Sequence, residues 1–153
     1  MKKGFSLVEL MIAVTIIGIM LSLGISAYAR GRDRQSGRSA GEQIISFLSQ
    51  NQKKADIGDE DCTGKYLGQS LTISLTTSIT AESVCTGGSG SVENITISGI
   101  TSMTGGTILF KPLSGGATVS VDPLNIDYTT TSGSVFRVQV TSSGTIDYKG
   151  VQP

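Results

Sequence analysis

Residues 1–29 of the chain read MKKGFSLVELMIAVTIIGIMLSLGISAYA, in which two lysines and a glycine precede a long apolar run. Residues 10–29 contain no charged side chain. As a helix they would extend about 30 Å, which matches the hydrocarbon thickness of a bilayer. The stretch therefore predicts a transmembrane helix. Glu9 stands at the start of the apolar run, where a charge is costly in lipid and needs an explanation.

An ordinary secretory signal peptide is one alternative, because Lys2 and Lys3 form a basic start and residues 27–29 form a small-x-small cleavage site. Cleavage after Ala29 would release a secreted β-rich binding domain. However, the apolar run is longer than the usual hydrophobic region of a signal peptide, which also gains nothing from Glu9. A plain membrane anchor is the other alternative. Charge counting does not settle its orientation, because lysines flank one end and a cluster of arginines the other.

Cleavage after Gly4 would give Glu9 a function. Phe5 would then carry the amino terminus, whose amine is mostly protonated near neutral pH because its reference pKa is about 8. Glu9 would lie one helical turn further on, where its charge complements the positive end of the helix dipole. In a bundle of such helices the carboxylate could also pair with the amine of a neighbouring copy, and this pairing would favour one axial stagger of the subunits.

Residues 2–10, Lys-Lys-Gly-Phe-Ser-Leu-Val-Glu-Leu, followed by an apolar helix, resemble the class III leader and N-terminal segment of type IV prepilins and type II secretion pseudopilins. The resemblance implies that a prepilin peptidase cuts after Gly4 and that Phe5 is N-methylated. It also implies that Glu9 acts in assembly. Most members of the family carry a proline where this chain has Ser26, so a kink of the helix at this point stays open.

The resemblance further implies a location and a set of partners. The chain would cross the plasma (inner) membrane once before assembly, with its leader in the cytoplasm, and would then join an extracellular pilus or pseudopilus. Its partners would be further copies in a helical filament or other pilins, the prepilin peptidase, the inner-membrane assembly machinery and membrane lipid. A minor pilin or pseudopilin of a type II secretion or DNA-uptake pseudopilus is the alternative within the family.

The remainder of the chain predicts an α+β fold, in which the long N-terminal helix continues as an amphipathic half and packs on a mostly antiparallel β-sheet head. Residues at three- and four-residue spacing form an apolar stripe: Ala40, Ile44, Phe47, Leu48 and Ala55. Three glycines are expected to interrupt the helix before this stripe, and Gly58 is expected to end it. The predicted parts are the leader 1–4, the transmembrane and assembly helix 5–29, the soluble half of the helix 30–57 and the head 58–153.

Short alternating runs separated by Gly, Ser and Thr predict the strands of the head. The predicted strands are residues 71–75, 95–97, 107–111 and 119–121, and a hairpin of residues 135–140 with 145–148. Alternation of this kind buries one face of each strand, which favours an antiparallel sheet lying on the helix.

Cys62 and Cys85 are the two cysteines, and in an exported head they predict one disulfide. The chain has no histidine, which removes Ser–His–Asp and Cys–His catalysis as well as His-based zinc sites. We therefore expect no enzyme activity and no cofactor. Four acidic residues crowd one turn, but their spacing is not that of an EF-hand loop, so we expect a solvated turn without a metal ion; they are Asp56, Asp59, Glu60 and Asp61.

Four arginines follow the apolar run, at positions 30, 32, 34 and 38. They could contact phosphate groups at a membrane surface, or form ion pairs with Asp33, Glu42 and neighbouring subunits, or simply be solvated. Because the net charge of the chain is zero, its composition does not indicate nucleic acid as a partner, and that possibility stays open.

Overall fold

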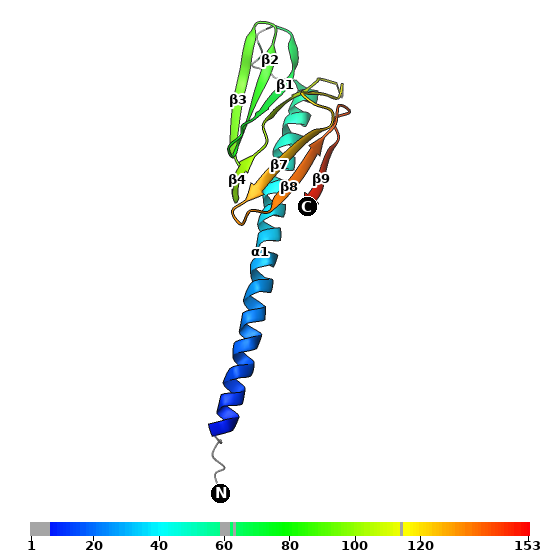
Figure 1. The fold of residues 1–153 in the computed structure, drawn as a ribbon. Helices are drawn as coiled ribbons and strands as arrows, with labels where there is room; N and C mark the ends of the chain where they lie inside the picture. The colour runs from blue at the N-terminus through cyan, green and yellow to red at the C-terminus, as the bar shows by residue number, and fades with distance from the viewer. Residues whose placement is uncertain (1–6, 59–61, 63, 114) are drawn as a thin grey trace. The chain divides into compact units, whose positions relative to one another are not determined.

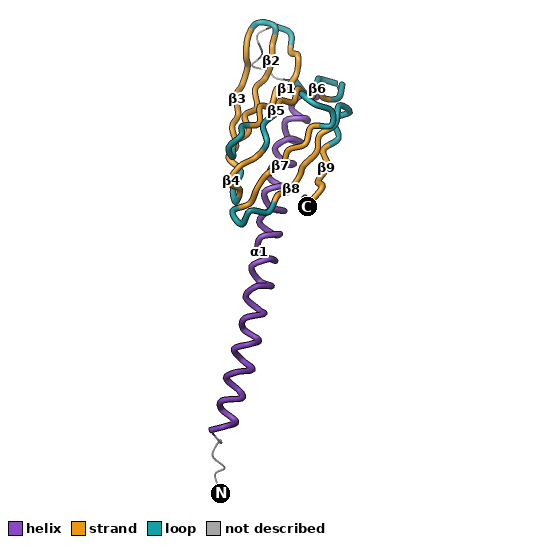
Figure 2. Tube along the Cα trace, in the orientation of Figure 1, coloured by secondary structure: helices purple, strands orange, loops and turns teal. Residues whose placement is uncertain are grey.

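The computed structural model describes residues 7–58, 62, 64–113 and 115–153, without the side chains of residues 22–27 and 89. Within these residues the chain forms one helix followed by nine strands (Figures 1 and 2). The chain divides into two units, Met1–Arg34 and Gln35–Pro153. The elements are α1 (Leu7–Ile57), β1 (Tyr66–Ile73), β2 (Ser78–Cys85), β3 (Gly88–Thr96), β4 (Ile100–Met103), β5 (Gly106–Phe110), β6 (Ala117–Val119), β7 (Leu124–Thr130), β8 (Val135–Val140) and β9 (Ile146–Val151).

Helix α1 is a single helix of 51 residues. Its ends carry the charges that suit the helix dipole, with Glu9 in the first turn and Lys54 in the last. Gly58 follows the helix with a φ of 93°, and its N–H donates to the carbonyl oxygen of Lys54 at 2.9 Å. This left-handed glycine ends the helix where the sequence predicts the end.

The predicted apolar stripe of α1 is buried. Its members have exposed fractions of 0 to 4%, and they are Ala40, Ile44, Phe47, Leu48 and Ala55. They share one hydrophobic core with inward side chains of the strands, including Leu71, Phe110 and Val138. The α+β class, with the helix packed on antiparallel strands, is therefore confirmed.

The head contains two sheets where the sequence predicted one. A five-stranded sheet has the order β3-β2-β1-β5-β6, and a four-stranded sheet has the order β4-β7-β8-β9 (Figure 2). Every pairing within them is antiparallel. Strand β6 contacts the turn between β8 and β9, because the Ala117 N–H donates to the Ser142 carbonyl oxygen at 2.9 Å.

The strand predictions hold in part. The hairpin of β8 and β9 is present, and β8 has the predicted bounds, Val135–Val140. The strand predicted at 119–121 is wrong in its bounds, because β6 is Ala117–Val119 and ends where the prediction begins. Three strands were missed, namely β2, β4 and β7. In β2 the inward positions are Ile79, Ala81, Ser83 and Cys85, and the polar Ser83 interrupts the apolar alternation.

The expected interruption of the helix by glycine is also wrong. Helix α1 continues through Gly31, Gly37 and Gly41. A Cβ atom on Gly37 would overlap the ring of Phe136, and one on Gly41 would lie 2.5 Å from the hydroxyl oxygen of Tyr128. These two glycines therefore let the helix backbone approach the four-stranded sheet, and the packing compensates for their low helix propensity.

We expect Gly37→Ala to destabilise the head although alanine is the better helix former. The methyl group must displace Phe136 from a packed core, which costs about 1–3 kcal/mol and exceeds the gain in propensity of about 1 kcal/mol. Gly31→Ala is the matched control, because no atom lies within 4 Å of its added Cβ. Urea unfolding of the full chain in mild detergent, followed by tyrosine fluorescence, measures both. Equal stability of the two variants would contradict the close-packing explanation.

Candidate assembly site

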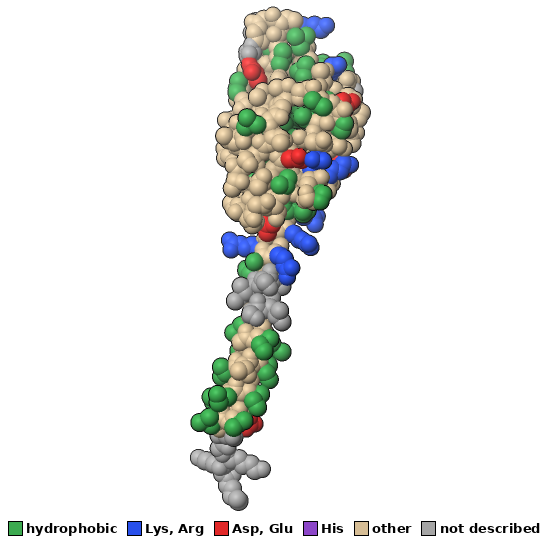
Figure 3. Space-filling view, viewed as in Figure 1, with side chains coloured by type: hydrophobic (Ala, Val, Ile, Leu, Met, Phe, Trp, Pro, Cys, Tyr) green, Lys and Arg blue, Asp and Glu red, His purple; other side chains and the backbone are tan. Residues whose placement is uncertain are grey.

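The first described part of α1 exposes apolar side chains around its whole circumference. Consecutive residues such as Leu10, Met11 and Ile12 are all more than half exposed, so no face of the helix is covered. Figure 3 shows apolar side chains along this part of the helix on the face in view. The exposed large apolar residues here are Leu7, Val8, Leu10, Met11, Ile12, Val14, Ile16, Ile17, Ile19, Met20 and Leu21. A helix that is apolar all round is typical of membrane spans and of the interiors of large assemblies.

Two polar side chains, Glu9 and Thr15, interrupt this apolar surface. They differ in whether a polar partner within the chain binds them. The Thr15 hydroxyl donates to the carbonyl oxygen of Ile12 at 2.8 Å and lies 3.1 Å from that of Met11. Thr15 is thus compatible with an apolar environment, because its hydroxyl bonds the preceding turn. The Glu9 carboxylate is exposed, and no lysine or arginine of the described residues forms a salt bridge with it.

The other residues of the predicted processing site lie outside the described residues. These are Gly4, at the predicted cleavage, and Phe5, at the predicted methylation. The predicted transmembrane segment 5–29 is described only in part, because it includes residues 5 and 6 and the side chains of residues 22–27. In the part of the chain that the structure describes, no helix has the length and apolar character that crossing a membrane requires.

The arginines that follow the apolar part of α1 lie on exposed helix. Arg30, Arg32 and Arg34 are all exposed, as is Tyr28, whose exposed fraction is 73%. One of the predicted ion pairs is present, between Arg38 Nε and Glu42 Oε1 at 3.0 Å. Both side chains of this pair are largely exposed, so it contributes no more than about 0.5 kcal/mol to stability.

A buried polar cluster lies between α1 and the five-stranded sheet. Asn51 is fully buried, and its side-chain N–H donates to the Phe47 carbonyl oxygen at 2.9 Å. Gln69 of β1 donates to the Asn51 amide oxygen at 3.3 Å and accepts from the Ser83 hydroxyl at 2.9 Å. This cluster was not predicted from the sequence. The position of Asn51, one turn beyond Phe47 on the buried stripe, is the feature that could have revealed it.

A second buried polar contact joins α1 to the four-stranded sheet. The Tyr128 hydroxyl donates to the Gly37 carbonyl oxygen at 2.8 Å, and its ring stacks on Phe136 with 5.7 Å between centroids. Burial, and then the neighbouring Tyr148 hydroxyl, raise the pKa of Tyr128 well above its ordinary value. Tyr128 is therefore held neutral in the folded head.

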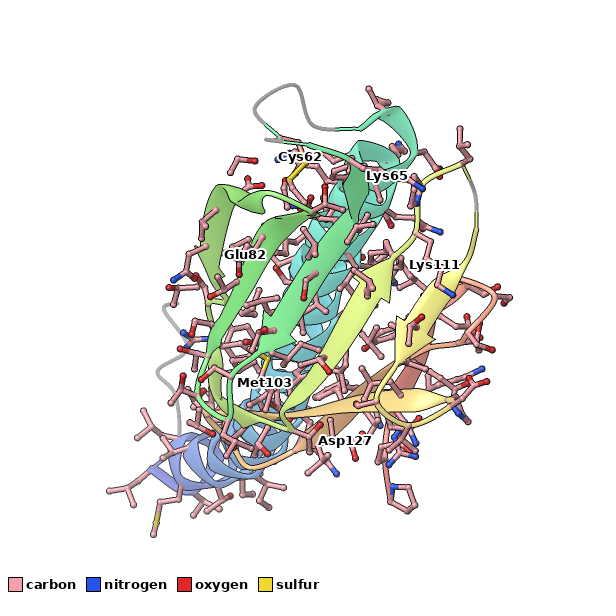
Figure 4. The ribbon with its side chains drawn as sticks, turned by 90° about the horizontal axis from the view of Figure 1, so that it is seen from above. Cys62, Lys65, Glu82, Met103, Lys111 and Asp127 are labelled. Atoms are coloured by element: carbon pink, nitrogen blue, oxygen red, sulfur yellow. A yellow bond between two sulfur atoms is a disulfide. The ribbon has the colours of Figure 1, made fainter. Side chains whose placement is uncertain are left out.

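The predicted disulfide is present between Cys62 and Cys85, whose Cα atoms are 5.8 Å apart (Figure 4). It joins the segment after α1 to the end of β2 and closes a loop with a sequence separation of 23. In the chain-entropy model such a loop stabilises the fold by about 3 kcal/mol. Residues 59–61 of the acidic turn are outside the described residues. Among the described residues, no group of three or more acidic or cysteine side chains could hold a metal ion.

The N-terminal part of the chain matches a known family model. The chain carries a prokaryotic N-terminal methylation motif. The match covers residues 1–25 and confirms the resemblance to type IV prepilins. It includes Glu9 and the exposed apolar surface described above. Neither the curated proteins nor the solved structures contain a match to the chain.

We expect the stability of the head to fall in alkali in a way that depends on Tyr128. The unfolded chain loses the phenolic proton near pH 10, whereas the folded head keeps it, so the contribution is fully present below about pH 10 and declines above it. The limiting slope is about 1.4 kcal/mol per pH unit. Tyr128→Phe removes this part of the slope, and at neutral pH it costs about 1 kcal/mol for the lost hydrogen bond.

Urea unfolding of the full chain across alkaline pH measures this slope for each variant. Tyr28→Phe is the control, because Tyr28 is exposed and the loss of its hydroxyl leaves the packing of the head unchanged. A slope that is the same in Tyr128→Phe and in the unmodified chain would show that Tyr128 ionises normally in the head.

Proposed function

We propose that this chain is a structural subunit of a type IV pilus or a related filament, and that it assembles through its N-terminal helix. The observation that carries the proposal is the methylation motif at residues 1–25, combined with a carboxylate in the first turn of a helix that is apolar all round. The proposed role is mechanical, with no catalytic step. A peptidase and the assembly machinery of the inner membrane act on the chain.

The first proposed step is maturation. A prepilin peptidase cuts after Gly4, and Phe5 becomes a methylated N-terminus with a protonated amine. The parts of the mature subunit are then an assembly helix, residues 5–29, its soluble continuation, residues 30–57, and the head, residues 58–153. Before assembly, residues 5–29 lie in the inner membrane with the head outside.

The second proposed step is docking, in which Glu9 sets the register. A charged carboxylate in lipid costs at least a few kcal/mol when it has no partner. The amine of Phe5 in a neighbouring copy is the partner that the processed chain supplies. A subunit displaced along the filament by one helical turn would leave both charges unpaired, so the pairing favours one stagger.

The third step transfers the apolar helix from lipid to the filament core. Lipid tails and packed helices are similarly apolar, so one exposed surface serves both environments. Thr15 does not oppose the transfer, because its hydroxyl is already bonded to the preceding turn. The head then covers the outside of the filament, where the Cys62–Cys85 disulfide suits an oxidising environment.

Intact mass and N-terminal sequencing of the chain, expressed together with a prepilin peptidase, test the first step. We expect a mature chain that begins at Phe5 and carries one additional methyl group. A mature chain beginning at Arg30 would replace this function with that of a secreted binding domain released after Ala29. A chain that keeps Met1 in the presence of an active peptidase would contradict maturation and leave a plain membrane anchor.

Glu9→Gln tests the second step, because glutamine has nearly the same shape but cannot pair with an amine as an ion. We expect its incorporation into filaments to fall at least tenfold, while maturation and the thermal stability of the head stay unchanged. Thr15→Val is the matched control, since it removes a polar group that is already satisfied within the helix. Filaments are quantified by shearing and immunoblotting. Equal incorporation of Glu9→Gln and Thr15→Val would show that Glu9 has no role in docking.

A further inference from the structure

The sequence beyond the apolar part of α1 has a feature that filament assembly does not explain. Within five residues the helix carries three exposed arginines, Arg30, Arg32 and Arg34, and one aspartate, Asp33. Tyr28, also exposed, precedes them. Under the proposed function these arginines lie on the outer side of the membrane, where positive charge is ordinarily scarce. With three positive charges and one negative charge, this segment keeps a net positive charge, which suits an anionic ligand in that location.

Their spacing on the helix separates them around its axis. At about 100° per residue, Arg34 lies within about 40° of Arg30, while Arg32 lies about 200° away, on the opposite side. The three side chains therefore lie on two opposite sides of the helix, Arg30 with Arg34 and Arg32 across from them, and we call this two-sided set the arginine ring. A linear polyanion such as duplex DNA approaches from one side and would leave Arg32 or the other pair without a phosphate. A layer of headgroups around an inserted helix reaches all three.

Their height along the helix also matches a membrane boundary. From Leu7 to Tyr28 the helix rises about 32 Å, close to the thickness of the hydrocarbon core, and from Arg30 to Arg34 it rises about 6 Å, close to the thickness of one headgroup layer. Tyrosine at the edge of the apolar part and arginine just beyond it are the residue types that occupy these two depths. Figure 3 shows basic side chains gathered on the helix beyond its exposed apolar part.

We infer that Arg30, Arg32 and Arg34 form a ring that binds the phosphate groups of anionic phospholipids in the outer leaflet of the inner membrane before assembly. The inference rests on the proposed function, whose membrane stage it deepens by naming the lipid. Guanidinium groups suit this ligand because they bind phosphate oxygens through paired N–H donors. Arg38 is not included, because it belongs to the second unit, where it pairs with Glu42 at 3.0 Å.

The test offers the full chain, diluted from mild detergent, to a mixture of two vesicle populations. One contains only phosphatidylcholine, and the other also contains phosphatidylglycerol. Flotation and immunoblotting give the ratio of chain in the two populations. We expect the unmodified chain to favour the anionic vesicles, with each arginine contributing up to about fivefold to the ratio at low salt. High salt should reduce the preference, because it screens exposed charges.

Three variants make the result specific. Arg30→Gln/Arg32→Gln/Arg34→Gln should distribute almost equally between the two populations. The corresponding triple lysine variant should keep most of the preference, since the charge remains. Arg38→Gln/Glu42→Gln is the matched control on the same helix, and it should behave as the unmodified chain because its net charge is unchanged. Tyrosine fluorescence and circular dichroism verify that each variant keeps a folded head.

The outcomes separate this inference from the proposed function. Equal distribution of the unmodified chain, or a preference that survives in the glutamine variant, overturns the lipid ring and leaves filament assembly intact. A chain recovered with neither population overturns both the ring and the membrane stage of the proposed function. Inorganic phosphate and duplex DNA are added as competitors in separate samples. If either abolishes the preference through the same three arginines, the ring is a general phosphate or nucleic-acid site and the assignment to lipid is wrong.

Discussion

The head depends on how closely α1 can approach the four-stranded sheet. Gly37 and Gly41 lack side chains where Phe136 and Tyr128 press against the helix, and the Tyr128 hydroxyl reaches the Gly37 carbonyl oxygen only because the backbone is near. The apolar stripe that continues from Ala40 then meets both sheets in one core. A side chain at Gly37 would move the helix away from this sheet. The Tyr128 hydroxyl would then lose its hydrogen bond to the Gly37 carbonyl oxygen.

The parts of the fold that the sequence predicts are those with one clear periodicity. The stripe through Ile44 and Leu48 and the alternation of β8 each follow one clear pattern, so the helix and this strand follow directly. Strand β7 also alternates buried and polar residues and could have been predicted. Strand β2 is harder to predict, because the buried Ser83 interrupts its apolar face, and the Ser83 hydroxyl is satisfied there by donating to Gln69. This hydrogen bond joins two different strands, so the local periodicity of β2 does not reveal it.

The residues of the candidate site also differ in whether the local sequence or only a long-range contact reveals their role. Glu9 was identifiable because the charge contradicts the apolar run around it, and the cysteines because they are the only two in the chain. The roles of Gly37 and Gly41 were missed, since a glycine lowers helix propensity whatever it packs against. The relevant facts are the ring of Phe136 beside Gly37, and the hydroxyl of Tyr128 with the ring of Tyr148 beside Gly41. All three aromatic residues are distant from the glycines in the sequence. The Gly-x3-Gly spacing was the available indication of a close approach.

Under the proposed function, the apolar surface of α1 cannot by itself set the direction of assembly. Lipid tails and neighbouring helices offer it nearly equal free energies, so transfer between them is almost balanced. The polar groups at the two ends of the segment must then decide. At one end Glu9 gains a partner on assembly, which favours the filament. At the other end Arg30, Arg32 and Arg34 would leave the headgroups, which favours the membrane. The lipid charge of the membrane would therefore tune how readily a subunit is extracted, through residues that are distant from the docking carboxylate.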